Sequence, residues 1–410
     1  MKRSGRLFYG WIIVAASFLV ITIAYGAVFT FGVFLTPLRE YFGATTAVIS
    51  GAYSLAMISY SSFGILTGWV VDKYGPKLTT LLGGLLTGLA LLAGSQVNAI
   101  WQLYVSYALL GAGMSAGYTP LMPTISRWFT KRRGLAMGII SSGVGVGPLI
   151  MAPLASYLIA TNGWRFAYLV MASAAIIIIA ASFLMKRSPE EIGELPDGRV
   201  RNGGITQTKP EANKVTAQIG GLSLKEAIGT KSFWLLAFMY LMVGIGILMI
   251  LGHVAAYSQG KGLSPIAAAA VLSTITGSSI AGRLVLGVIS DRIGRKKALA
   301  FCLCGEGVMI FYLIGASSPW MFFLFGAIYG FCYGGHVPQL PALIGETLGL
   351  AHMGVLLGAV AFLWGVGGVI GPVLAGRIVD ITGSYSGAFI AGAIAMFLAA
   401  LAVSLVRKAF

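Results

Sequence analysis

An arginine stands within a long apolar segment of this chain. Arg283 lies eight residues before Asp291, where the apolar run 265–290 ends. With a rise of about 1.5 Å per helical residue, its Cα lies roughly 12 Å inside that end. A guanidinium at this depth of a membrane costs about 3 kcal/mol or more, and such residues usually face a cavity and bind a ligand. Because a guanidinium can hold a carboxylate through two hydrogen bonds, we expect a small organic anion as the ligand.

The alternative role for Arg283 is structural, as one half of a buried ion pair. Glu306 is the candidate partner, because it lies at a similar depth in the next apolar segment, 298–316. We favour ligand binding, since ionisable residues within membrane segments are by default functional.

Two further polar residues, Tyr118 and His336, each follow a glycine and precede a proline by two positions. Either could hydrogen-bond a hydroxyl or oxo group of the ligand. Histidine titrates nearest to physiological pH, so His336 is also a candidate proton carrier. Its alternative role is a hydrogen bond to a backbone carbonyl freed beside Pro338. Glu306 and His253 are the other proton-coupling candidates. The remaining side chains expected at the site are Ser279, Tyr333, Tyr25, Phe29 and Phe362.

The composition places these residues in a membrane. Hydrophobic residues make up 57% of the 410 positions and charged residues 10%, and the mean hydropathy is +0.88. So few charges cannot cover a water-exposed surface, which excludes a soluble globular protein. The net charge of +16 therefore does not indicate a nucleic-acid partner, because the distribution of cations between the two membrane sides matters more than their sum.

Twelve apolar runs are long enough to cross a hydrocarbon core of about 30 Å. They lie at residues 11–37, 46–71, 78–96, 100–126, 134–160, 165–185, 233–258, 265–290, 298–316, 320–345, 354–376 and 386–406. With a cytoplasmic N-terminus, the inner side holds 23 of the 28 lysines and arginines and the outer side holds four. This asymmetry predicts that both termini are cytoplasmic.

Two halves of the chain repeat one pattern. Gly68-Trp-Val-Val-Asp72-Lys73-Tyr-Gly75 recurs 219 positions later as Gly287-Val-Ile-Ser-Asp291-Arg292-Ile-Gly294, which Arg295 follows. A second match, of Gly117–Pro123 with Gly335–Pro341, has an offset of 218. Paired proline-broken helices in equivalent positions of two halves indicate the binding site of a transporter.

The interruption of the apolar pattern predicts three parts. These are an N-terminal six-helix bundle at 1–186, a flexible cytoplasmic linker at 187–222, and a C-terminal six-helix bundle at 223–410. Ser223 and Glu226 have the spacing of a capping box, which predicts a short surface helix at the start of the third part.

No pattern in the sequence indicates catalysis or a cofactor. Cys302, Cys304 and Cys332 lie in apolar segments without metal-ligand spacing, so we expect neither a disulfide nor a metal site. Paired acids, activated nucleophiles and metal clusters are not found at catalytic spacing, so we do not expect an enzyme.

The two charged turns resemble the signature loop of the major facilitator superfamily, and the resemblance covers the whole chain. The signature residues are Gly68, Asp72, Lys73, Gly75, Gly287, Asp291, Arg292, Gly294 and Arg295. The second copy is complete, whereas the first has Pro76 where a cation is usual. The resemblance implies an all-α membrane protein with twelve transmembrane helices in two pseudo-symmetric six-helix bundles.

A narrower resemblance lies between the fourth and fifth apolar runs. The stretch Arg127-Trp-Phe-Thr-Lys-Arg-Arg-Gly-Leu-Ala-Met-Gly138 is similar to the signature of the monocarboxylate transporter family and its bacterial relatives, which include oxalate and formate exchangers. Tyr9-Gly10-Trp11 resembles the other mark of the family, without the usual preceding acidic residue. In that family an arginine of span 8 is the expected carboxylate anchor, and Arg283 occupies its position.

The chain departs from the family pattern at three places. Ser279 and Phe29 stand where animal members tend to carry an aspartate and a lysine, so proton coupling cannot be transferred residue by residue. The segment Phe362-Leu363-Trp364 lacks the second cation of the oxalate exchangers, and a single buried cation favours a monoanion over a dianion.

Together these patterns predict a secondary active transporter of short monocarboxylates such as lactate or pyruvate. We expect proton symport by alternating access in a multi-pass protein of the cell membrane, acting as a monomer. Exchange of organic anions of the oxalate and formate type without a proton is the alternative. A membrane sensor that binds a ligand without transporting it is a more remote one.

Overall fold

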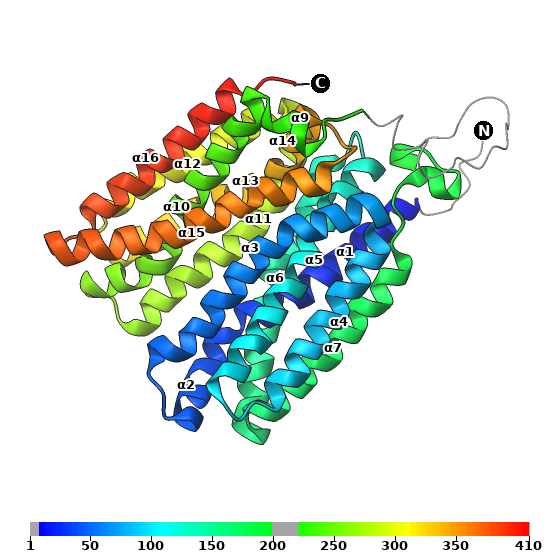
Figure 1. The fold of residues 1–410 in the computed structure, drawn as a ribbon. Coiled ribbons are helices and arrows are strands. Elements are labelled where there is room, and N and C mark those ends of the chain that lie inside the picture. The colour runs from blue at the N-terminus through cyan, green and yellow to red at the C-terminus, as the bar shows by residue number, and fades with distance from the viewer. Residues whose placement is uncertain (1–7, 199–219, 410) are drawn as a thin grey trace. The chain divides into compact units, whose positions relative to one another are not determined.

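The computed structural model describes residues 8–198 and 220–409, and every regular element in them is a helix (Figure 1). This confirms the predicted all-α class. The expected cytoplasmic cations Lys2, Arg3 and Arg6, and residues 199–219 of the expected linker, lie outside the described residues.

The chain divides into two compact units. Unit 1 contains the described residues of Met1–Gly221 together with Leu350–Gly358, and unit 2 contains Leu222–Gly349 together with the described residues of Ala359–Phe410. Helix α15 (Met353–Thr382) therefore begins in unit 1 and continues in unit 2.

Unit 1 is built from long helices that pack through small residues. Its long helices are α1 (Tyr9–Phe29), α2 (Phe31–Phe42), α3 (Thr46–Tyr74), α4 (Pro76–Ser95), α5 (Ile100–Trp128), α6 (Arg133–Asn162) and α7 (Trp164–Leu184). Contacts join α1 to α6, α3 to α5, and α4 to α5 and α7. At Gly147 of α6 an added Cβ would overlap the Thr22 carbonyl oxygen of α1. Glycine at this position is what allows the two backbones to approach closely.

Unit 2 has the same kind of packing. Its helices are α9 (Leu224–Ile228), α10 (Lys231–Gly260), α11 (Pro265–Ile293), α12 (Arg295–Ile314), α13 (Pro319–His336), α14 (Gln339–Leu348), most of α15, and α16 (Ser386–Leu405). Helix α11 packs against α13, and α12 packs against α13 and α16. The predicted capping box at α9 is confirmed, because Ser223 Oγ accepts from the Glu226 amide at 3.3 Å and Glu226 Oε2 accepts from the Ser223 amide at 2.8 Å.

Eleven helical stretches among the described residues are long and apolar enough to cross a membrane. The twelfth predicted span corresponds to α5, which is helical over the whole range expected for it. Its sequence includes Gln102, Pro120, Pro123 and Arg127, and the stretch Gly111–Gly117 is buried. A helix covered by protein needs less apolar character than one that faces lipid.

The expectation of paired proline-broken helices is right for one half only. In unit 2, α13 ends at His336 and α14 begins at Gln339, with Pro338 between them. In unit 1, α5 continues through both Pro120 and Pro123. Thr124 Oγ1 donates to the Pro120 carbonyl at 2.8 Å. Hydroxyl groups of this kind help a membrane helix to tolerate proline without breaking.

The first part of the expected linker has defined structure. Two 3₁₀ turns, Pro189–Ile192 and Pro196–Gly198, follow α7. Trp128 Nε1 donates to the Lys186 carbonyl at 3.2 Å, and Arg187 donates to the Asp72 carbonyl. This segment is therefore tied to unit 1.

Candidate functional site

Arg283 is one of the largest fully buried side chains of the described structure, with 1% of its surface exposed. It lies on α11, which is one of the eleven candidate membrane helices. Its Nη1 donates to Ser279 Oγ at 3.0 Å, one helical turn earlier. Its Cζ lies 5.6 Å from the centroid of the Tyr333 ring on α13. A hydroxyl and an aromatic face are neutral groups, so these two contacts orient the guanidinium without carrying a negative charge themselves.

Close packing of α11 against α13 sets the position of Arg283 relative to Tyr333. An added Cβ at Gly334 would overlap the Ser279 carbonyl oxygen, and one at Gly282 would overlap the carbonyl oxygen of Phe331. The two backbones therefore touch within the helical turn that precedes Arg283. A shift of either helix at this level would also move the other.

His336 and Glu306 form a buried pair between α13 and α12. His336 Nδ1 lies 2.6 Å from Glu306 Oε1, and the two residues are 1% and 0% exposed. The partner that the structure gives His336 is thus a carboxyl group and not the backbone carbonyl considered from sequence. Glu306, the candidate ion-pair partner of Arg283, is instead bonded to this histidine.

Unit 1 contains a cluster of aromatic residues that includes three of the predicted site residues. Tyr25 packs against Phe29 with ring centroids 5.6 Å apart and against Tyr118 at 6.4 Å. The Tyr25 hydroxyl lies 2.9 Å from the hydroxyl of Tyr60 on α3. Phe29 is 36% exposed. The cluster thus combines aromatic rings with the hydroxyl groups of its tyrosines.

Tyr60 is a residue that the sequence motifs do not single out. The repeat could have identified it, because the offset of 219 positions places Tyr60 in register with Ser279. By the same offset, Gly64 of unit 1 corresponds to Arg283 of unit 2. The guanidinium therefore distinguishes the second copy from the first.

Two of the predicted residues stand apart from the contacts around Arg283. His253 Nε2 lies 3.0 Å from the Pro372 carbonyl oxygen, and its Nδ1 lies 3.4 Å from the Tyr385 hydroxyl. Phe362 on α15 is 37% exposed. The geometry of His253 is that of a histidine that joins α10 to α15.

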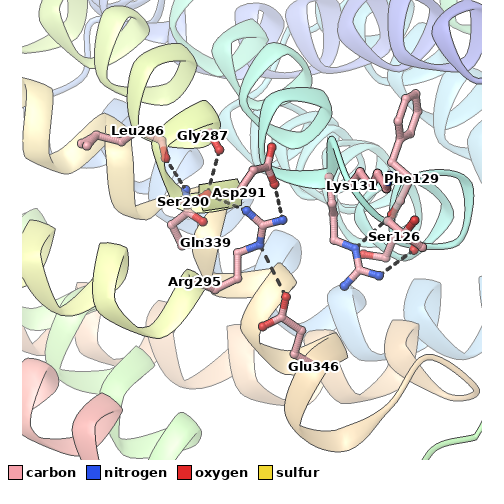
Figure 2. Close-up of polar contacts among 12 residues, drawn as sticks. Ser126, Phe129, Lys131, Leu286, Gly287, Ser290, Asp291, Arg295, Gln339 and Glu346 are labelled. Carbon is pink, nitrogen blue, oxygen red and sulfur yellow. Dashed lines mark hydrogen bonds and ion pairs between the residues drawn. The ribbon is translucent and has the colours of Figure 1, made fainter. Parts of the chain in front are cut away.

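The second signature turn is held together by one arginine (Figure 2). Arg295 Nη1 donates to Ser290 Oγ at 2.6 Å, Nη2 binds Asp291, and Nε lies 3.5 Å from Glu346 Oε1. Gly294 has the positive φ of 91° that the turn requires. Helix α11 therefore joins α12 through a charged, tightly bonded corner.

The first signature turn is bonded differently. Asp72 accepts from the backbone amides of Gly354 at 3.1 Å and Val355 at 2.9 Å, at the start of α15. Arg127 Nη2 lies 3.6 Å from Asp72 Oδ1. Gly75 has the corresponding positive φ of 86°.

The loop that resembles the narrower signature is bound by an acidic residue from beyond α7. Asp197 Oδ2 accepts from the Lys131 amide at 3.0 Å, and the Thr130 hydroxyl donates to the same oxygen. Burial alone would raise the pKa of Asp197, but these hydrogen bonds hold its pKa below the usual value. The carboxylate therefore stays charged at neutral pH beside this basic loop.

Comparisons with known proteins agree with this architecture. A family model described as the Major Facilitator Superfamily matches residues 17–291 and 268–409. Monocarboxylate transporter 13 of Rattus norvegicus is 29% identical over 388 residues, which cover 93% of this chain and 85% of that protein. Monocarboxylate transporter 12 of Mus musculus is 26% identical over 415 residues, covering 97% and 85%.

Solved structures share the fold at low sequence identity. The proton:xylose symporter XylE, bound to 6-bromo-6-deoxy-D-glucose, is similar with a TM-score of 0.77 and 12% identity, over 98% of this chain and 96% of that one. The fucose:proton symporter FucP of E. coli is similar with a TM-score of 0.75 and 12% identity, over 97% and 100%.

Proposed function

Since the chain belongs to the major facilitator superfamily and is a transporter related to the monocarboxylate transporters, we propose that it carries short monocarboxylates such as lactate or pyruvate together with a proton. Arg283 binds the carboxylate. Tyr118, Tyr333, Ser279, Phe29 and Phe362 stay as candidates for contacts with the rest of the substrate.

The burial of Arg283 carries this proposal. A guanidinium that is 1% exposed within a candidate membrane helix is costly unless a ligand or partner offsets its charge. Ser279 and Tyr333 orient its planar fork. A monocarboxylate supplies one negative charge and two acceptor oxygens in matching geometry.

The charge of the substrate supports coupling to a proton. Lactate is an anion at neutral pH, and moving one elementary charge against a membrane potential of 100 mV takes about 2.3 kcal/mol. A proton that moves with each anion makes the cycle electroneutral. We also propose that the protein acts as a monomer in the cell membrane with both termini in the cytoplasm.

Replacement of Arg283 tests the substrate site. The purified protein is reconstituted into liposomes, and uptake of radiolabelled L-lactate is measured under an inward proton gradient. Loss of one partner of a buried hydrogen-bonded charge pair costs about 2–5 kcal/mol. Uptake by Arg283→Ala should therefore fall to the level of protein-free liposomes, and Arg283→Lys should transport with a much higher KM because lysine cannot bind bidentately.

The control is Arg377→Ala, which removes an exposed arginine near the C-terminal end of α15. We expect it to transport like the wild type. Saturable uptake by folded, monodisperse Arg283→Ala would move the carboxylate site elsewhere. The same liposomes separate symport from exchange, because an exchanger needs internal anion and ignores the proton gradient. A sensor would bind lactate without any flux.

A further inference from the structure

A buried carboxyl and imidazole pair lies in unit 2, close to Arg283 but separate from its direct contacts. Glu306 and His336 are 0% and 1% exposed, and Nδ1 and Oε1 are 2.6 Å apart. Two such atoms at this distance share a hydrogen bond, so one proton lies between them. An ionisable pair buried within two candidate membrane helices is costly to maintain and indicates a functional role.

Few other titratable groups face this pair. Cys302 of α12, together with Tyr329 and Cys332 of α13, lies within electrostatic reach of Glu306. Tyr333 of α13 packs on the His336 ring with centroids 5.7 Å apart. On α11, Arg283 is the charged residue that contacts Tyr333. Helix α16, which also packs against α12, has no titratable side chain. On α14, Glu346 pairs with Arg295 at the signature turn.

The second oxygen of Glu306 is left without compensation. Glu306 Oε2 and the Tyr329 hydroxyl have no hydrogen-bond partner among the described residues. A carboxylate with an unsatisfied buried oxygen is less stable than a neutral acid or an ion pair in the same place. A negative charge on the pair is therefore costly unless another group offsets it.

Tyr333 connects the pair to Arg283. The centroid of its ring lies 5.6 Å from Arg283 Cζ and 5.7 Å from the centroid of the His336 ring. The glycine contacts between α11 and α13 hold this arrangement in place. Arg283 and His336 thus share one aromatic neighbour, which limits their separation to on the order of 10 Å.

The charges of the two groups balance in two different ways. In the first arrangement, without substrate, a Glu306 carboxylate accepts the Nδ1 proton of His336, and Arg283 offsets its negative charge. When a monocarboxylate binds, it neutralises Arg283 and the pair loses that compensation. The pair then takes up one proton at the free imidazole nitrogen, and its net charge becomes zero. Both states are neutral overall, and the difference between them is one anion and one proton.

The size of this effect follows from the separation. Two unit charges about 10 Å apart at an effective dielectric constant near 20 change the proton affinity of the pair roughly tenfold. Because the coupling is reciprocal, protonation of the pair strengthens carboxylate binding by the same factor.

We propose that Glu306 and His336 form the proton-binding site of the transport cycle, and that a carboxylate bound at Arg283 makes this site take up its proton. The inference rests on the proposed monocarboxylate transport and names the residues that couple it to the proton gradient.

The test compares two assays on Glu306→Gln and His336→Gln in liposomes. Counterflow of labelled against unlabelled L-lactate requires substrate binding and exchange but no net proton movement. Accumulation against a lactate gradient requires coupling, and one pH unit can drive it about tenfold. Both variants should keep counterflow and lose accumulation, because each lacks one of the two groups that together bind the proton and balance its charge.

Two further substitutions serve as references. Glu40→Gln makes the same chemical change at an exposed position of α2 and should accumulate lactate like the wild type. His253→Gln removes the competing histidine. Loss of accumulation in His253→Gln, with accumulation intact in Glu306→Gln and His336→Gln, would assign the proton to His253 and overturn the inference.

A measurement on the wild type keeps the inference testable if a variant does not fold. Addition of L-lactate to the protein in weakly buffered detergent solution, followed with a pH indicator dye, should take up about half a proton per bound lactate at the pH of greatest uptake, as a tenfold change in proton affinity requires. Binding without proton uptake overturns the inference and leaves lactate transport standing. Absence of both binding and counterflow in the wild type instead overturns the proposed function itself.

Discussion

At the scale of single residues, the two aspartates of the repeated turn have different partners. Asp291 binds Arg295, four residues later on its own corner. Asp72 accepts hydrogen bonds from the amides of Gly354 and Val355. The cause is local, because Pro76 occupies the position that Arg295 has in the second copy. Without that cation, the Asp72 carboxylate caps the positive end of α15, where an anion is favoured.

We predict that Asp72→Ala destabilises the protein by about 1–2 kcal/mol, because two amides at a helix start lose their acceptor. The melting temperature in detergent, followed by intrinsic fluorescence, measures the change. Glu346→Ala is the comparison, because it removes a half-exposed partner of Arg295 and such ion pairs contribute about 0–1 kcal/mol. A loss at Glu346 as large as that at Asp72 would contradict the capping role.

At the scale of helices, the contact between α11 and α13 positions the candidate site. Arg283 and Ser279 lie on one helix, and Tyr333 and His336 lie on the other. Glycines at 282 and 334 let the backbones touch. Residues about fifty positions apart in the sequence are thereby held side by side. The proposed carboxylate anchor and the proposed proton site therefore depend on a shared, tightly packed helix pair.

We predict that Gly334→Ala reduces transport, although the substitution adds only one methyl group. The added methyl group overlaps the Ser279 carbonyl oxygen, and overpacking of this kind costs about 1–3 kcal/mol. The KM for lactate should rise, because the guanidinium shifts relative to Tyr333. Gly277→Ala is a matched control on α11, since no atom lies within 4 Å of its added Cβ. Equal KM values for the two variants would contradict the prediction that packing of α11 against α13 positions the substrate site.

At the scale of the whole molecule, the distribution of cations predicts the orientation in the membrane. The inner loops hold 23 of 28 lysines and arginines when both termini are cytoplasmic. Lys73 and Arg295 then lie on the inner side, and Arg39 and Arg377 lie on the outer side. Cytoplasmic loops carry this excess in membrane proteins generally.

Labelling in intact cells tests this orientation. After replacement of the three native cysteines, Glu40→Cys should react with a membrane-impermeant maleimide added outside. Lys225→Cys, on the exposed face of α9, should react only after the membrane is permeabilised. The reverse pattern would invert the predicted topology.

The sequence alone determined the class of protein and singled out Arg283 as the candidate for the centre of the site. The lengths of the apolar runs indicate membrane spans, because a lipid bilayer requires about twenty apolar residues in every span. The positions of lysine and arginine predict the orientation, and the repeat predicts two similar halves. The same reasoning isolated Arg283, since a charge in such a segment is rare and costly. The two signature turns, with their positive-φ glycines, were also recognisable from local sequence.

Only the tertiary structure decided which side chains are partners. It paired Glu306 with His336 and not with Arg283, placed Tyr60 beside Tyr25, and kept α5 unbroken through its prolines. These results depend on which helix faces meet, and residues such as Glu306 and His336 are thirty positions apart. A pattern within one helix fixes the depth of a residue in the membrane. The direction in which that residue points is set by packing between helices, which the order of amino acids along one segment does not express.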